Sequence, residues 1–172
     1  MKPRRHARCL TLEILYECDL AEHDSLAVLQ KRAEDNSTIV DYLKSEQIDV
    51  EGDEEQEEIP EQFSEHTLEF AENLLRGIDD YLPSINTLIT RYAPEWPLEQ
   101  IAVIDRNILR IAIYEVLIDQ NTPIKVAINE AVELAKMYGS DSAPRFVNGV
   151  LGTLTEKVDE LRLELLGEPV TT

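Results

Sequence analysis

The chain has 172 residues, of which 43% are apolar and 30% are charged, and its 35 acidic and 16 basic side chains give a formal net charge of -19. This length suits one domain with its own hydrophobic core, so we expect neither a disordered tail nor a multidomain enzyme. No run of 18 apolar residues occurs, and the basic N-terminus lacks the apolar segment of a signal peptide. Cys9 and Cys18 form no CxxC pair. We therefore expect a cytoplasmic protein without a membrane span, disulfide, metal or cofactor.

Helical periodicity dominates the pattern of apolar residues. Side chains of this kind recur at three- to four-residue spacing, and no stretch shows the alternation of a β-strand. We predict an all-α fold of about six or seven helices in a single domain. The predicted helices cover Arg4 to about His23, Ser25 to Ala33, Leu68 to Ile89, Leu98 to Asp119, Ile124 to Met137, and about Ser142 to Leu166.

Caps and breakers refine these boundaries. Ser25 is a good N-cap for the second helix, and Gly139 and Gly167 are natural stops for the last two. Pro83 lies inside the third stretch, where one kinked helix and two shorter helices fit equally well. The run RYAPEWP predicts a turn before the nearly all-apolar central helix.

Most of the acidity lies in one segment of the chain. Residues 34–65 carry thirteen acidic side chains and one basic side chain. Residues 45–62 have almost nothing apolar to bury and many like charges, so we expect a solvated, mobile acidic insertion there.

The first helix combines basic and aromatic side chains outside its core stripe. That stripe is centred near three residues, Ala7, Ile14 and Cys18. At about 100° per residue, Arg5 and Tyr16 fall opposite the stripe and Arg8 lies on its flank, while Cys9 and Leu12 also fall on the outer face. The basic residues of this helix and Tyr16 form the mixture that binds phosphates and stacks an unpaired base. The basic residues are Lys2, Arg4, Arg5 and Arg8. A solubilising helix end beside an ordinary surface tyrosine explains the same feature and is favoured when the feature is taken alone.

An aromatic residue stands out near the start of the last predicted helix. Phe146 lies about 100° from the stripe of its helix, next to Arg145, and either packs at the edge of the core or is offered as a stacking platform.

In the central helix, Asp105 and Glu115 lie within the apolar stripe. A carboxylate there is costly unless it is paired, so each is expected to meet a base or to mark a surface where a partner supplies the cation. The candidate bases are Arg91, Arg106 and Arg110.

Signatures of catalysis are missing from the sequence. It contains no GxGxxG, Walker, GxSxG or HExxH motif, and its three histidines, His6, His23 and His66, lie in or near polar sequence that we expect to be exposed. Asp105 and Glu115 are about 15 Å apart along a helix, too far to act together on one bond. A binding module is therefore the better interpretation than an enzyme.

Three stretches taken together resemble one known family. They are RRHARCLTLEILYECDL, IAVIDRNILRIAIYEVL, and VAINEAVELAKMYG followed by RFVNGVL. In order and spacing they resemble the NusB family of bacterial transcription antitermination factors, over nearly the whole chain except about residues 24–65. The resemblance implies two packed helical bundles. It also implies binding of single-stranded boxA-type RNA of ribosomal RNA leader transcripts, together with the ribosomal protein NusE, in an RNA polymerase antitermination complex.

The resemblance carries site residues over to matching positions. It implies RNA binding by five residues, Arg4, Arg5, Arg8, Tyr16 and Phe146. We expect Asp141 and Arg145, which lie near Phe146 in the sequence, to belong to the same RNA site. It implies that Asp105 faces the NusE partner, and we expect its neighbours Glu99 and Arg106 to belong to the same surface.

Departures from the family pattern concern charge. His6 stands where some members have another arginine, and the loop SDSAPR places Ser142 and Pro144 where relatives have polar residues. RNA affinity is therefore expected to be lower. We also hypothesise that the acidic insertion reduces nonspecific RNA binding by competing with phosphate for the arginines.

Other functional readings remain open at the level of sequence. Similar helical domains occur fused to RNA methyltransferases, but this sequence has no glycine-rich methyl-donor loop, so we expect no such enzyme. A protein-only adaptor that binds a basic ribosomal protein is the main alternative, favoured by the net charge. A homodimer that hides the arginines is also compatible with the sequence.

Overall fold

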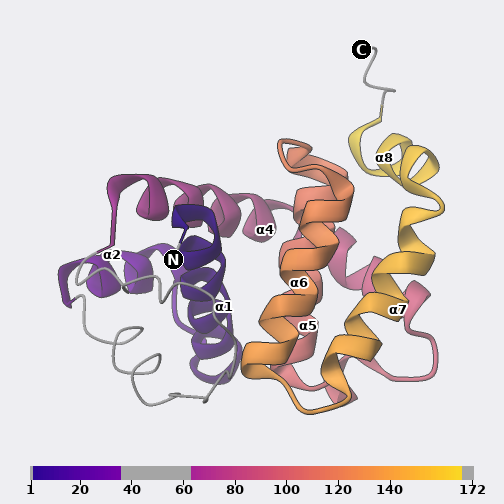
Figure 1. The fold of residues 1–172 in the computed structure, drawn as a ribbon, viewed down its shortest axis with the longest axis horizontal. Coiled ribbons are helices and arrows are strands. Elements are labelled where there is room, and N and C mark those ends of the chain that lie inside the picture. Colours follow the sequence, from indigo (N-terminus) through magenta and orange to yellow (C-terminus); the bar gives the residue numbers. More distant parts are fainter. Residues whose placement is uncertain (1, 36–62, 168–172) are drawn as a thin grey trace, which may run out of the picture. The chain divides into compact units, whose positions relative to one another are not determined.

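A computed structural model describes residues 2–35 and 63–167 of the chain. These ranges contain seven α-helices and no β-strand (Figure 1). The α-helices are α1 (Pro3–Ala21), α2 (Ser25–Asp35), α4 (Glu65–Tyr92), α5 (Val103–Ile113), α6 (Ile124–Tyr138), α7 (Ala143–Thr155) and α8 (Val158–Leu166). A short 3₁₀ turn, η1 (Leu98–Gln100), precedes α5, and a π-helical turn, η2 (Tyr114–Asp119), follows it. The predicted all-α class and number of helices are confirmed, and none of the described helices is long and apolar enough to cross a membrane.

The chain divides into two compact units, Met1–Asn73 and Leu74–Thr172. The first unit contains α1, α2 and the start of α4, and the second contains the rest of α4 and the later helices. In the second unit α5, α6 and α7 pack against one another and α8 contacts η2. The predicted acidic insertion at 45–62 falls outside the described residues, and the organisation of both units as a single domain stays a prediction.

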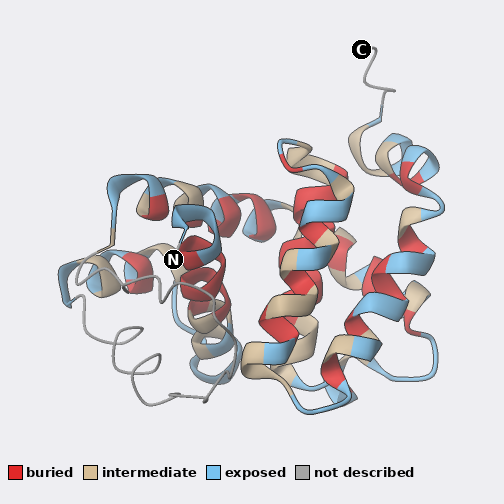
Figure 2. Ribbon diagram, viewed as in Figure 1, coloured by how far each residue is buried: buried red, intermediate tan, exposed pale blue. Residues whose placement is uncertain are grey.

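Helix α1 is buried over most of its first half. Pro3 occupies its first turn, where a missing N–H costs no helical hydrogen bond, and the residues at 6–12 are all buried (Figure 2). Cys9 and Leu12 have no exposed surface. The prediction that these two residues lie on an outer face is therefore wrong. A single apolar stripe underestimates the buried arc of a helix that is covered on several sides.

His6 is part of this buried segment, although its sequence context predicts exposure. Its side chain is 2% exposed, and its ring lies 4.8 Å from the ring of Phe63, measured between centroids. Burial lowers the pKa of His6, because the protonated imidazolium would lose its hydration. The other two histidines, His23 and His66, are exposed as predicted.

Helix α2 begins at Ser25, but the preceding residue provides the cap. A carboxylate oxygen of Asp24 accepts a hydrogen bond from the backbone N–H of Ala27 at 3.3 Å. This is the usual relation between an N-cap residue and the third helical residue, so the prediction that Ser25 is the cap is wrong by one position. Asp24 is also the better choice on electrostatic grounds, since its negative charge lies at the positive end of the helix.

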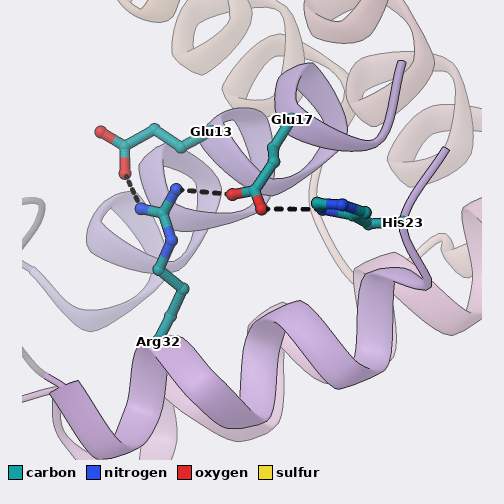
Figure 3. Close-up of polar contacts among 4 residues, drawn as sticks. All are labelled: Glu13, Glu17, His23 and Arg32. Atoms are coloured by element: carbon teal, nitrogen blue, oxygen red, sulfur yellow. Dashed lines mark hydrogen bonds and ion pairs between the residues drawn. The ribbon is translucent and has the colours of Figure 1, made fainter. Parts of the chain in front are cut away.

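A cluster of charged side chains connects α2 to α1. The guanidinium of Arg32 donates to Glu17 at 3.0 Å and to Glu13 at 3.4 Å, and His23 lies 3.1 Å from the other oxygen of Glu17 (Figure 3). These bonds from Arg32 and His23 lower the pKa of Glu17. Since α2 has only two buried apolar residues, Val28 and Leu29, this cluster is an important part of its attachment.

We expect Arg32→Gln to lower the free energy of unfolding by about 1 kcal/mol at neutral pH. The pKa of Glu17 is lower in the folded state, so the stabilisation is fully present above the unfolded pKa and is lost as the pH falls through the folded one. The difference between variant and wild type should therefore shrink in acid. Urea unfolding at pH 7 and below pH 4 measures it.

The neighbouring exposed residue Lys31 offers a matched control, because Lys31→Gln removes the same charge from the same helix. That variant should stay within about 0.5 kcal/mol of wild type. Equal losses in both variants would mean that net charge, and not the cluster, determines the effect.

In the second unit, α4 continues through Pro83 as a single helix, which decides between the two alternatives that the sequence left open. The predicted central helix begins later than expected, at Val103, because Ala102 has an extended backbone with φ -51° and ψ 135°. It also ends in the π-helical turn η2. The predicted turn at RYAPEWP is confirmed, with η1 following it.

The predicted last helix is two helices, α7 and α8, which are separated at Glu156 and Lys157. Neither a glycine nor a proline marks the break, and the apolar spacing continues across it, so periodicity could not reveal it. Gly167 ends α8 with a positive φ of 74°, as predicted. Gly139 ends α6 without a positive φ.

Gly77 permits a close approach between α4 and η2. A Cβ atom at this position would overlap the ring of Tyr114, which is 8% exposed. The absence of a side chain at Gly77 therefore determines how closely this tyrosine packs on α4.

Gly77→Ala should lower the free energy of unfolding by about 1–3 kcal/mol, because the ring of Tyr114 must move. Gly149→Ala is a matched control within α7, where nothing lies within 4 Å of the added Cβ. This control should raise the free energy of unfolding by about 0.5–1 kcal/mol, since alanine favours a helix over glycine. Chemical denaturation distinguishes the two, and a neutral Gly77→Ala would contradict the packing argument.

Candidate nucleic-acid interface

The first turn of α1 concentrates positive charge. Lys2, Arg4 and Arg5 are exposed, and this turn contains no acidic residue. The N-terminus of a helix already carries a partial positive charge from its unpaired N–H groups, so cations there are unfavourable unless an anion binds. The arrangement suits a phosphate group in an otherwise acidic chain.

Arg8 lies one turn further along α1 but is only 3% exposed. The expectation that it lies at the surface, on the flank of the core, is therefore wrong. Its guanidinium carbon lies 5.2 Å from the centroid of the Phe70 ring, and that of Arg4 lies at the same distance from the same ring. The cation–π contact is one of the interactions that accompany this burial, and the ring face partly replaces lost hydration.

Tyr16 lies outside the core, as predicted, and is 40% exposed. Leu20, one turn later on the same side of α1, is 61% exposed. The sequence analysis missed Leu20, although its spacing of four residues from Tyr16 is the signal that could have found it. Together the two residues offer an aromatic and an aliphatic side chain to solvent.

Three predicted site residues gather where α7 begins. Asp141 and Arg145 are exposed, and Phe146 is half-buried. The backbone N–H of Phe146 bonds to the carbonyl of Ser142 at 3.1 Å, which places its ring in the first turn of the helix. These residues belong to the second unit, whereas the arginines and Tyr16 belong to the first.

Asp105 is half-buried in the first turn of α5, and burial raises its pKa. Within the described parts of the chain it has no hydrogen-bond or ion-pair partner. One of its oxygens lies next to Gly139, where an added Cβ would be 3.4 Å away. The expected internal base is therefore not found for this residue. Its neighbours in the predicted partner surface, Glu99 and Arg106, are exposed and half-buried respectively.

Glu115 is more deeply buried, at 1% exposure, and accepts a hydrogen bond from the hydroxyl of Thr122 at 3.1 Å. Arg91, one of the bases proposed as its partner, instead forms a bidentate pair with Glu164 at 2.9 and 3.0 Å. Nothing in the sequence indicated Thr122 as the partner, because a buried carboxylate is expected first of all to meet a charged base.

Comparison with known proteins decides the family. A family model described as the NusB family matches residues 5–156. The chain belongs to the NusB family. Transcription antitermination protein NusB of Roseiflexus sp. (strain RS-1) is 38% identical over 161 residues, which cover 92% of this chain and 96% of the relative. The protein of that name from Dehalococcoides mccartyi (strain CBDB1) is 37% identical over 153 residues, 89% of this chain and 90% of the relative.

Solved structures agree with this assignment to the NusB family. A T. maritima NusB structure aligns with a TM-score of 0.71 and 29% identity, and covers 96% of this chain and 99% of that chain. A crystal structure of antitermination factors NusB and NusE in complex with dsRNA aligns with a TM-score of 0.68, over 91% of this chain and 98% of that chain. Its 20% identity shows the similarity of fold.

The structure of this NusB-family chain also exposes Trp96, at 51%, in the turn that leads to η1. The sequence analysis treated this stretch only as a turn. A tryptophan between two prolines in polar sequence is the signal that could have marked it, because large aromatic residues in turns lack an obvious core to join. Within the described residues, no group of histidine, cysteine or carboxylate side chains could hold a metal ion.

Asp105→Asn should make the protein more stable at neutral pH, with a Tm about 1–3 °C higher. The pKa of Asp105 is raised on folding, so the wild type loses stability as the pH rises through that pKa, whereas asparagine does not titrate. The advantage of the variant should therefore disappear in acid. Thermal unfolding at pH 7 and pH 3.5 tests this, with the exposed Glu99→Gln as control. A less stable Asp105→Asn at pH 7 would mean that the carboxylate has a stabilising contact.

Proposed function

We propose that this protein is a transcription antitermination factor that binds single-stranded boxA-type RNA of ribosomal RNA leader transcripts together with ribosomal protein NusE, in an RNA polymerase antitermination complex. The names of relatives that are 37–38% identical over most of the chain give transcription antitermination as their role. The observation that carries the RNA part is the exposed basic first turn of α1 in a chain of net charge -19. The protein acts as a binding factor and not as an enzyme, in the cytoplasm where transcripts are made.

The electrostatics of the chain support a local and salt-sensitive RNA contact. The overall negative charge repels RNA, so only positions with uncompensated cations can attract a phosphate. Arg4 meets this condition through its exposure and its place at the positive end of α1, and Arg5 is exposed in the same turn. Because so few cations are involved, we expect weak binding by the protein alone, and this binding should fall as the salt concentration rises.

Aromatic side chains supply the second element of the proposed interface. Tyr16 in the first unit, and Phe146 with the neighbouring Arg145 in the second, are accessible enough to stack with unpaired bases. Stacking discriminates single-stranded from paired RNA, since bases in a duplex already have neighbours. Edge contacts to these bases would then select the sequence.

NusE is the proposed protein partner, as in the solved complex of NusB and NusE with dsRNA. A basic ribosomal protein suits the half-buried Asp105, whose carboxylate has no partner in the described chain and would gain a cation on binding. The partner would also add phosphate contacts of its own. Joint binding should therefore be tighter than binding by either protein alone.

A protein-only adaptor is the second candidate. It is favoured by the net charge of -19 and by the burial of Arg8, which removes one cation from direct contact with RNA. In this case NusE would bind the acidic surface and the N-terminal arginines would contribute only solubility.

Fluorescence titration of boxA-like RNA and a scrambled RNA, with and without NusE and at two salt concentrations, tests the proposal. We expect selective binding that strengthens with NusE and falls with salt. Arg5→Ala should weaken RNA binding about three- to tenfold, because one phosphate contact is lost. Tyr16→Ala should weaken it about five- to fiftyfold if a base stacks on the ring.

Matched variants separate these contacts from general effects. Lys31→Ala removes one positive charge from α2, and Leu163→Ala shortens an exposed apolar side chain of α8, outside the proposed interface. Both should bind RNA like the wild type. Binding of NusE without selectivity for boxA-like RNA would support the adaptor instead.

A further inference from the structure

The ring of Phe70 is shared by two arginines of α1. Arg4 and Arg8 are one helical turn apart, so their side chains leave the same face of α1. Each guanidinium carbon lies 5.2 Å from the centroid of the half-buried Phe70 ring. Phe70 lies on α4, outside the three stretches that resemble the NusB family, and the sequence predicted no role for it.

A hydrogen bond holds the start of α4 in register with the start of α1. The hydroxyl of Thr67 donates to the carbonyl of Pro3 at 3.3 Å, and Thr67 is 1% exposed. Ser64 caps this end of α4, since its side chain accepts the N–H of Thr67 at 3.1 Å. Phe70 follows Thr67 by one turn, and Arg4 follows Pro3 directly. The register that joins Thr67 to Pro3 therefore also brings the ring to the arginines.

An aromatic ring orients an arginine differently from a carboxylate. A carboxylate would fix the guanidinium but neutralise its charge, whereas the ring face restrains it and leaves the charge available to a phosphate. Within the described residues, the ring of Phe70 is the only group that restrains the guanidinium of the exposed Arg4. Arg8 lies against the same ring and is buried, so it is not placed to touch a ligand itself.

We infer that Phe70 is a positioning residue for RNA binding, which preorganises the guanidinium of Arg4 for a phosphate, and that the buried Arg8 supports this arrangement without touching the RNA. This inference rests on the proposed function. It divides the three arginines of the basic N-terminus into direct contacts, Arg4 and Arg5, and a supporting residue, Arg8.

Phe70→Leu tests the inference, because leucine keeps an apolar side chain but removes the ring. Binding of boxA-like RNA should weaken about two- to fivefold, the loss expected for one cation–π contact. The slope of affinity against salt concentration should not change, since the cations that neutralise phosphates are all retained. Phe70→Tyr keeps the ring face and should bind RNA nearly as the wild type does.

Two readouts separate positioning from a merely structural role. In the Arg4→Ala background, Phe70→Leu should have little further effect on RNA affinity, because the side chain that it positions is gone. Nitrogen-15 relaxation of the Arg4 Nε–H group should show a restrained side chain in the wild type and in Phe70→Tyr, and a mobile one in Phe70→Leu. Circular dichroism melts check that each variant is folded.

The outcomes distinguish this inference from the proposed function. If the wild type binds boxA-like RNA selectively, and Arg4→Ala weakens binding while Phe70→Leu does not, the inference is wrong and the function stands. An Arg4 Nε–H group that is equally mobile in wild type and Phe70→Leu would overturn it as well. If the wild type shows no selectivity for boxA-like RNA, the proposed function fails and the inference fails with it.

Discussion

Burial of the first half of α1 is the constraint on which much of the first unit depends. Residues 6–12 are all buried, although this stretch includes a histidine and an arginine. The histidine and the arginine are accommodated in the core in different ways. His6 has a lowered pKa and its ring meets that of Phe63 at a tilt of 41°, whereas the guanidinium of Arg8 lies against the ring of Phe70. The helix therefore carries positive charge at its start while it forms part of the core immediately afterwards.

The two carboxylates of the central helix show how burial separates structural roles from binding roles. Glu115 is almost completely buried and receives the hydroxyl of Thr122, so it is satisfied within the chain. Asp105 is half-buried, has a raised pKa and has no partner in the described residues. A carboxylate that is kept at a cost to stability is a reasonable place for a cation from another protein. Both carboxylates lie in the apolar stripe of the same predicted helix, but only that of Glu115 has a partner within the described chain.

Much of the fold follows from sequence, because apolar periodicity depends on local geometry that every helix shares. Boundaries were less predictable where tertiary contacts decide them. The break between α7 and α8 has no local signal, and the cap at Asp24 was assigned to Ser25 because both residue types cap helices well. For the site, exposure of Arg5 and Tyr16 followed from helical angles, but burial of Arg8 did not. The buried guanidinium lies against the ring of Phe70, which is on α4 and far from Arg8 in the chain.

The π-helical turn η2 changes which backbone groups are available to the C-terminal helix. The N–H of Gln120 bonds to the carbonyl of Glu115 at 3.2 Å, five residues back, so the carbonyl of Val116 is not used in the α-helical register. Arg162 of α8 donates to that carbonyl at 2.7 and 3.3 Å. Every amino acid offers the same carbonyl group. Homologous chains could therefore exchange the side chain at position 116 for another of similar size and keep this attachment, while a change at Arg162 would remove it.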